Sequence, residues 1–135
     1  MAEGKVLTGA GLRGQVAGKT SLSTVGKSGA GLTYRGYDVQ DLAENCQFEE
    51  VAYLIFFGEL PTSEQLAAYK AKLKSLRALP QALKEVLERI PADSHPMDVM
   101  RTGVSMLGNL ETEQSFEQQQ DVADRILATL PAIIC

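Results

Sequence analysis

Few residues in this 135-residue sequence are suited to chemistry, and they form no familiar catalytic set. Gly18-Lys19-Thr20 and Gly26-Lys27-Ser28 each resemble the end of a phosphate-binding P-loop. The full motif needs another glycine five residues before the Gly-Lys pair, because the backbone there must wrap around the phosphates. Arg13 and Ser21 occupy those positions. We therefore interpret both segments as parts of a hairpin.

The single histidine, His95, is a candidate metal ligand or general base. It has no second histidine or nearby cysteine with which to share a metal ion. It comes directly before Pro96, and proline is favoured in the first turn of a helix. We therefore interpret His95 as a residue at a helix start. Asp98 could orient it, or could only favour the dipole of that helix.

Two arginines are candidates for binding an anion. Arg35 could pair with a carboxylate, but Gly36 and Asp38 favour a turn followed by a helix cap at this place. Arg77 stands beside the break before Pro80 and is our candidate substrate-binding residue. A solvated helix end is the alternative for Arg77. No catalytic residue, cofactor-binding residue or metal ligand is assigned.

Composition excludes several classes of protein. The net charge of −4, from 13 basic and 17 acidic residues, argues against nucleic acid as a partner. No apolar run reaches the ~20 residues of a membrane span, and the first residues do not follow the pattern of a signal peptide. Cys46 and Cys135 are too far apart in the sequence to suggest a disulfide or metal framework. We expect a cytoplasmic protein.

The elements that would position these residues fall into two parts. Residues 1–37 hold nine of the 12 glycines and are predicted to form an N-terminal arm and a β-hairpin, with strands over 20–25 and 32–35. Residues 38–135 are predicted to be helical. Capping signals and apolar periodicity predict helices over 39–45, 48–57, 63–76, 80–90, 96–110 and from 115 to the end.

Three helices carry more specific predictions. Thr62 and Ser115 each stand three residues before a glutamine, which predicts two capping boxes. Lys70, Lys72 and Lys74 are expected to face water. The helix over 96–110 has two apolar faces, so it should lie inside a bundle; its glycines, Gly103 and Gly108, would allow close approach of another helix.

The last 15 residues read as an apolar helix. One face of this helix is an apolar stripe, and no glycine or polar tail follows it. Such a face needs another surface to cover it. We therefore expect the sequence to be the front part of a longer protein. The stripe consists of Ile126, Leu127, Leu130, Ile133 and Ile134.

Several motifs together resemble the citrate synthase family. Those that resemble its opening are Ser23–Gly29, Leu32–Asp38, Asp41–Glu44, Phe48–Leu54 and Gly58–Thr62. The segment 94–102 is similar to a later signature, and the likeness covers residues 10–135. The residues of segments 24–29 and 94–103 resemble those of the 2-methylcitrate synthase branch more than those of ordinary citrate synthases.

The resemblance implies an all-α fold, here a helical portion of the large domain with a small hairpin, and a homodimer. It implies condensation of propionyl-CoA, or acetyl-CoA, with oxaloacetate, so that acyl-CoA is a substrate and no cofactor is tightly bound. In this chemistry an aspartate takes a proton, two histidines act on the carbonyls and arginines hold carboxylates. The resemblance places those groups in the family's second half, so His95 receives no catalytic role.

Two alternatives remain open at this stage. The first is a citrate synthase that uses acetyl-CoA, because the pocket residues that separate the two enzymes would lie outside this sequence. The second is a non-catalytic helical module for oligomerisation, derived from such an enzyme. In the enzyme interpretation we expect the 135 residues to be inactive alone.

Overall fold

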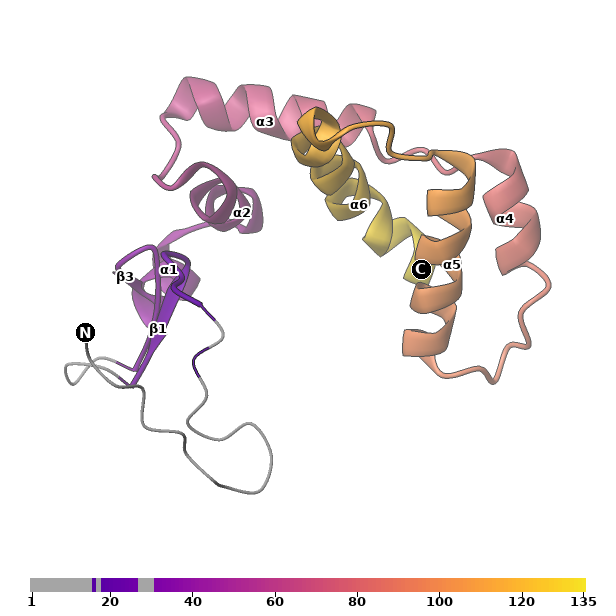
Figure 1. Ribbon diagram of the computed structural model, residues 1–135, viewed down its shortest axis with the longest axis horizontal. Helices are drawn as coiled ribbons and strands as arrows, with labels where there is room; N and C mark the ends of the chain where they lie inside the picture. Colours follow the sequence, from indigo (N-terminus) through magenta and orange to yellow (C-terminus); the bar gives the residue numbers. More distant parts are fainter. Residues whose placement is uncertain (1–15, 17, 27–30) are drawn as a thin grey trace, which may run out of the picture. The chain divides into compact units, whose positions relative to one another are not determined.

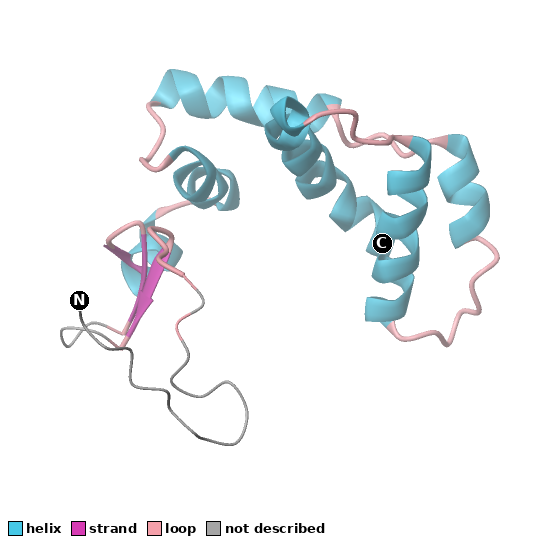
Figure 2. Ribbon diagram, in the orientation of Figure 1, coloured by secondary structure: helices cyan, strands magenta, loops and turns pink. Residues whose placement is uncertain are grey.

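The computed structural model describes residues 16, 18–26 and 31–135. The chain forms two compact units, Met1–Leu60 and Pro61–Cys135. The described part is mainly α-helical, with six α-helices and one three-stranded antiparallel sheet (Figures 1 and 2). The division into an arm with a hairpin, 1–37, and a helical part, 38–135, stays a prediction.

The first unit contains the sheet, in the order β1 (Ser23–Val25), β2 (Leu32–Tyr34) and β3 (Tyr37–Asp38). The predicted hairpin between the first two strands is confirmed, while Lys27 and Ser28 of its turn lie outside the described residues. The first strand is shorter than the predicted 20–25, because it begins at Ser23, so Gly18–Thr20 precede the hairpin and are not part of it. The third strand was not predicted. Arg35 and Gly36 both have positive φ, 49° and 92°, as a two-residue type I′ turn requires.

Two helices complete the first unit, α1 (Val39–Asn45) and α2 (Phe48–Phe57). Asp38 caps α1 as predicted, because its Oδ1 accepts a hydrogen bond from the Gln40 amide at 2.8 Å. Gly58 ends α2 at φ 93°, in the left-handed region that favours glycine. The start of α1 and the end of α2 therefore follow from local signals in the sequence.

The second unit contains α3 (Ser63–Ser75), α4 (Gln81–Leu87), α5 (Pro96–Leu110), a 3-10 turn η1 (Phe116–Gln118) and α6 (Gln119–Ile134). The capping box at Thr62 is confirmed by its two hydrogen bonds with Gln65. The predicted helix over 80–90 is too long, because α4 ends at Leu87. The chain then leaves the helix through bonds to carbonyls three residues back, at Arg89 and Ile90.

The prediction of a capping box at Ser115 is wrong. Ser115 makes no side-chain cap bond, and the chain enters α6 through η1 instead. Gln118, the expected partner, accepts a hydrogen bond from the Gln114 amide at 2.9 Å. The 3-10 turn before α6 is tighter than an α-helical turn and changes which backbone amides face the Ser115 side chain. Spacing in the sequence therefore does not by itself determine the capping partner.

The core of the second unit forms where α4, α5 and α6 meet, around Leu83, Leu107 and Ile133. Gly103 permits the close approach of α5 and α6, because a Cβ there would lie 2.4 Å from Ile133 Cγ2. The same expectation for Gly108 finds no support, since a Cβ there would meet nothing within 4 Å in the described part.

The apolar stripe near residue 135 is only partly covered within its unit. Ile133 is buried, whereas Ile134 is 42% exposed and the other three members are half-buried. The second apolar face of α5 is likewise uneven, because Leu110 is exposed and Met106 half-buried.

Candidate functional site

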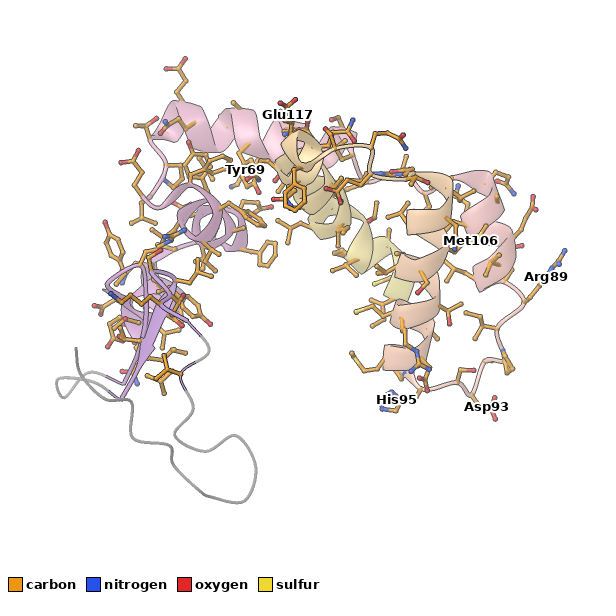
Figure 3. The ribbon with its side chains drawn as sticks, in the orientation of Figure 1. Tyr69, Arg89, Asp93, His95, Met106 and Glu117 are labelled. Carbon is orange, nitrogen blue, oxygen red and sulfur yellow. The ribbon has the colours of Figure 1, made fainter. Side chains whose placement is uncertain are left out.

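His95 is a structural residue at the start of α5, as predicted (Figure 3). Its Nδ1 accepts a hydrogen bond from the Met97 amide at 3.2 Å and so caps the helix. Asp98 does not orient the imidazole. Its carboxylate instead pairs with Arg101, 2.8 Å away and one helical turn along.

Arg35 also serves the fold. Its guanidinium donates to the Ile55 carbonyl at 2.8 Å, in the last turn of α2, and to the Ser21 hydroxyl at 2.6 Å. A cation at a helix C-terminus satisfies free carbonyls and complements the dipole. The structure therefore supports the turn-and-cap interpretation of this segment within the first unit.

Arg77 lies exposed in the segment between α3 and α4. Its side chain makes no hydrogen bond or ion pair with any residue in 16, 18–26 or 31–135. Its role in binding substrate stays a prediction. The neighbouring backbone is held firmly, however, by a different arginine that the sequence did not single out.

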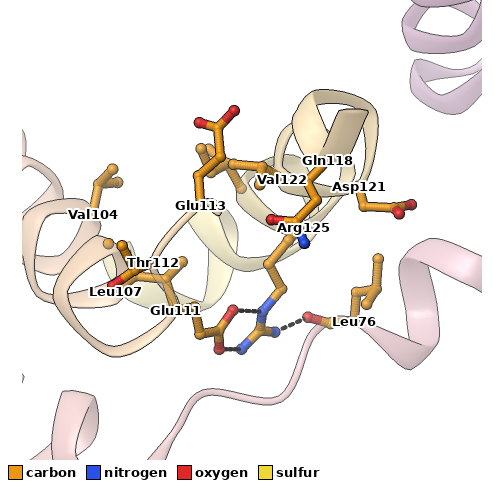
Figure 4. A pocket seen from close by; sticks show the side chains of 12 residues that line it. Leu76, Val104, Leu107, Glu111, Thr112, Glu113, Gln118, Asp121, Val122 and Arg125 are labelled. Carbon is orange, nitrogen blue, oxygen red and sulfur yellow. Dashed lines mark hydrogen bonds and ion pairs between the residues drawn. The ribbon is translucent and has the colours of Figure 1, made fainter. Parts of the chain in front are cut away.

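Arg125 of α6 fixes the segment on both sides of Arg77. Its guanidinium donates to the Leu76 carbonyl and forms two bonds to Glu111, of 2.6 and 2.8 Å (Figure 4). It also donates to the Ala78 carbonyl at 2.9 Å. Paired bonds between a guanidinium and a carboxylate are strong and directional. The Arg125 bond lowers the pKa of Glu111 and Glu111 raises that of Arg125.

A second polar cluster joins α3 to α6. The Asp124 carboxylate is 0% exposed and accepts from the Tyr69 hydroxyl at 2.9 Å, from Lys72 Nζ at 2.7 Å and from Gln120 Nε2 at 3.1 Å. Lys72 also reaches Asp121, 2.8 Å away. Lys72 is exposed, as expected from its helical position, and its two ion pairs are a feature that this position did not predict.

In this second cluster each charged or polar group is paired with a group of complementary charge or hydrogen-bonding capacity. Burial and then the hydrogen bond to Asp124 raise the pKa of Tyr69 strongly, so the phenol remains a donor. The hydrogen bonds to Asp121 and Asp124 raise the pKa of Lys72. No buried side-chain nitrogen or oxygen of the described residues lacks a partner. A cluster that satisfies itself in this way is suited to structure.

A cavity of about 500 Å³ lies beside the Arg125–Glu111 pair, between α5, η1 and α6 (Figure 4). Glu111, Glu113 and Asp121 supply carboxylates to its wall. The positive charge of Arg125 is already used by Glu111 and two carbonyls. Among the described residues that line it, the cavity therefore offers no free cation for an anionic substrate. Its apolar lining consists of Leu76, Val104, Leu107, Val122 and Ile126.

The described residues bring together no nucleophile with a base, and no three His, Cys, Asp or Glu side chains are grouped to hold a metal ion. None of the six helices there is long and apolar enough to cross a bilayer. What this portion of the chain presents is a helical scaffold with two satisfied polar clusters.

The class of protein follows from comparison of this helical chain with known families. The family model described as "Citrate synthase, C-terminal domain" matches residues 11–135, so the chain belongs to the citrate synthase family. A solved citrate synthase from Thermoplasma acidophilum, in a ternary complex with carboxymethyl coenzyme A and oxaloacetate, has a TM-score of 0.81 and 27% identity. That match covers 90% of this chain and 33% of the other.

Two curated relatives narrow the comparison. The chain is 76% identical to a 2-methylcitrate synthase of Shewanella oneidensis over 135 residues, which are 100% of this chain and 36% of that protein. It is 41% identical over 131 residues to a citrate synthase of Mycolicibacterium smegmatis, covering 92% and 34%. The chain thus spans about a third of the length of these relatives.

Proposed function

We propose that the chain is the N-terminal part of the large domain of a 2-methylcitrate synthase. That enzyme would condense propionyl-CoA with oxaloacetate to give 2-methylcitrate and CoA. The observation that carries the proposal is 76% identity, extending over all 135 residues, to a protein with that name. Acyl-CoA would be a substrate, and no tightly bound cofactor is required.

The chain would contribute scaffold to this reaction. The Asp124 cluster holds α3 against α6, and Arg125 holds the segment around Arg77. Arg77 is the one exposed cation of that held segment, between Leu76 and Ala78, and is proposed to meet an anionic group of a substrate. Groups that form and break bonds would come from the remainder of the enzyme.

A chimera tests the proposal. The 135 residues replace the matching third of the Shewanella oneidensis protein, and CoA release from propionyl-CoA and oxaloacetate is measured. We expect release within about tenfold of the parent rate, and none from the 135-residue chain alone. Cys46 and Cys135 carry free thiols, so CoA must be separated by chromatography before it is quantified.

A citrate synthase that uses acetyl-CoA is the second candidate, favoured by the match to the Mycolicibacterium smegmatis protein. Because the pocket residues that separate the two enzymes would lie outside these 135 residues, the test uses the full-length enzyme of which the chain would be part, supplied with each thioester in turn. A higher kcat/KM for propionyl-CoA supports the first candidate, and a higher value for acetyl-CoA supports the second.

Self-association is part of the proposal. Exposed apolar side chains of the second unit, Phe116 at 84% exposed among them, favour burial against another surface. A homodimer in the cytoplasm, where Cys46 and Cys135 would stay reduced, is the proposed state. Light scattering that finds only a monomer of the chain at high concentration would contradict the self-association. The other members of the set are Met97, Leu110 and Ile134.

A further inference from the structure

Among the residues that the structure describes, one accessible side chain supplies a positive charge to the buried carboxylate of Asp124. Lys72 Nζ lies 2.7 Å from Asp124 Oδ2, and the Lys72 side chain is 42% exposed. Asp124 itself is fully buried. The ammonium can therefore be reached from solvent on one side while it compensates, on the other, a carboxylate that solvent does not reach.

Loss of the Lys72 charge would leave Asp124 with two neutral donors, the Tyr69 hydroxyl and the Gln120 amide. A buried carboxylate without a cation is strongly unfavourable. The same loss would free Asp121, which would then lie near Asp124 with no cation between them. Loss of the charge on this nitrogen would therefore weaken the packing of α3 on α6.

We propose that Lys72 is an acylation site, and that its reaction with an acyl thioester traps α3 and α6 apart. In the step, the ammonium first releases a proton to solvent. The neutral Nζ attacks the thioester carbonyl carbon, a C–N bond forms and the C–S bond breaks. The thiolate leaves and takes up the second proton of the nitrogen, so that no oxidant or reductant is needed.

The geometry makes the reaction depend on opening of the helix pair. While Nζ bridges Asp121 and Asp124, it holds its proton and has no lone pair for attack. Nζ becomes reactive only when α3 separates locally from α6. The amide that forms has one N–H and no charge, so it cannot restore the two ion pairs. Acylation thus captures the opened state, independently of the proposed condensation.

Lys74 provides a matched control on the same helix. It is exposed and makes no ion pair within the described part of the chain. The chain is incubated with propionyl-CoA at mildly alkaline pH, and occupancy of each lysine is followed by peptide mass spectrometry. We expect Lys72 to react about tenfold or more slowly than Lys74 in the folded chain, and at a similar rate in denaturant.

The second measurement is hydrogen exchange of α6 amides. Chains acylated at Lys72 should exchange faster than chains acylated at Lys74, and K72Q faster than K74Q, while K72R should keep the slow exchange. Equal acylation rates in the folded chain, no acylation of Lys72 where Lys74 reacts, or unchanged exchange after acylation of Lys72 would overturn the proposal. If K72Q does not fold, the rates measured on the unmutated chain decide.

Discussion

Tyr69 donates its hydroxyl hydrogen to Asp124 Oδ1 at 2.9 Å, across 55 positions of sequence, and both side chains are buried. The bond joins the middle of α3, where Figure 3 labels Tyr69, to α6. Together with Lys72 and Gln120 it completes the set of donors around a carboxylate that solvent does not reach. Because the hydrogen bond requires these two side chains to meet, it favours one particular packing of α3 against α6.

Removal of the phenol hydroxyl should destabilise the chain. Y69F leaves Asp124 with one donor fewer in a buried place, so we expect a loss of about 1–3 kcal/mol in the free energy of unfolding. Urea denaturation measures the loss. The control is Y37F in the first unit, where the ring is exposed; a loss as large in Y37F would contradict the account.

Acid should weaken the Arg125–Glu111 pair. The folded state lowers the pKa of Glu111, from 4.5, because Arg125 bonds to its charged form. A lowered folded pKa gives stability that is present above the unfolded pKa and is lost as pH falls through the folded one. The difference in free energy of unfolding between the chain and E111Q should therefore narrow below about pH 4.5. A difference that stays constant or widens in acid would contradict this assignment.

Two glycines of α5 should respond oppositely to alanine. G103A places a Cβ against Ile133 and should cost about 1–3 kcal/mol, because the packed helices must shift. G108A meets nothing in the described part and should raise stability by up to about 1 kcal/mol, the difference in helix propensity. Thermal unfolding of both variants gives the comparison. Destabilisation by G108A equal to that by G103A would show that Gly108 is covered in solution.

The pH dependence on the alkaline side should come from the other cluster. Tyr69 and Lys72 both have raised pKa values in the folded chain. Stability from such groups is complete below the unfolded pKa and is lost as pH rises through the folded one. The free energy of unfolding should therefore fall above about pH 10 in the unmutated chain and fall less in Y69F. Parallel curves would rule out Tyr69 as a cause.

Sequence patterns predicted the features that are decided locally. Asp38, Thr62 and His95 mark helix starts, because a cap involves residues two or three positions apart. The spacing of apolar residues gave all six helices. The capping box at Ser115 was predicted on the same grounds and is wrong, because the chain forms a 3-10 turn there.

The polar clusters could not be predicted in the same way. Lys72 looks like a solvent-facing lysine, since its partner Asp124 is 52 positions away and only the packing of α3 on α6 brings the two together. Arg125 and Glu111, 14 positions apart, meet through the loop and η1. The charged residues Asp121, Asp124 and Arg125, which stand at the start of the apolar part of α6, were the signal available in the sequence.

The most direct measurement is the mass of the product made by the Shewanella oneidensis chimera from propionyl-CoA and oxaloacetate. We expect 2-methylcitrate in amounts comparable with the parent protein. A chimera that matches the parent in circular dichroism and oligomeric state but forms no 2-methylcitrate would contradict it.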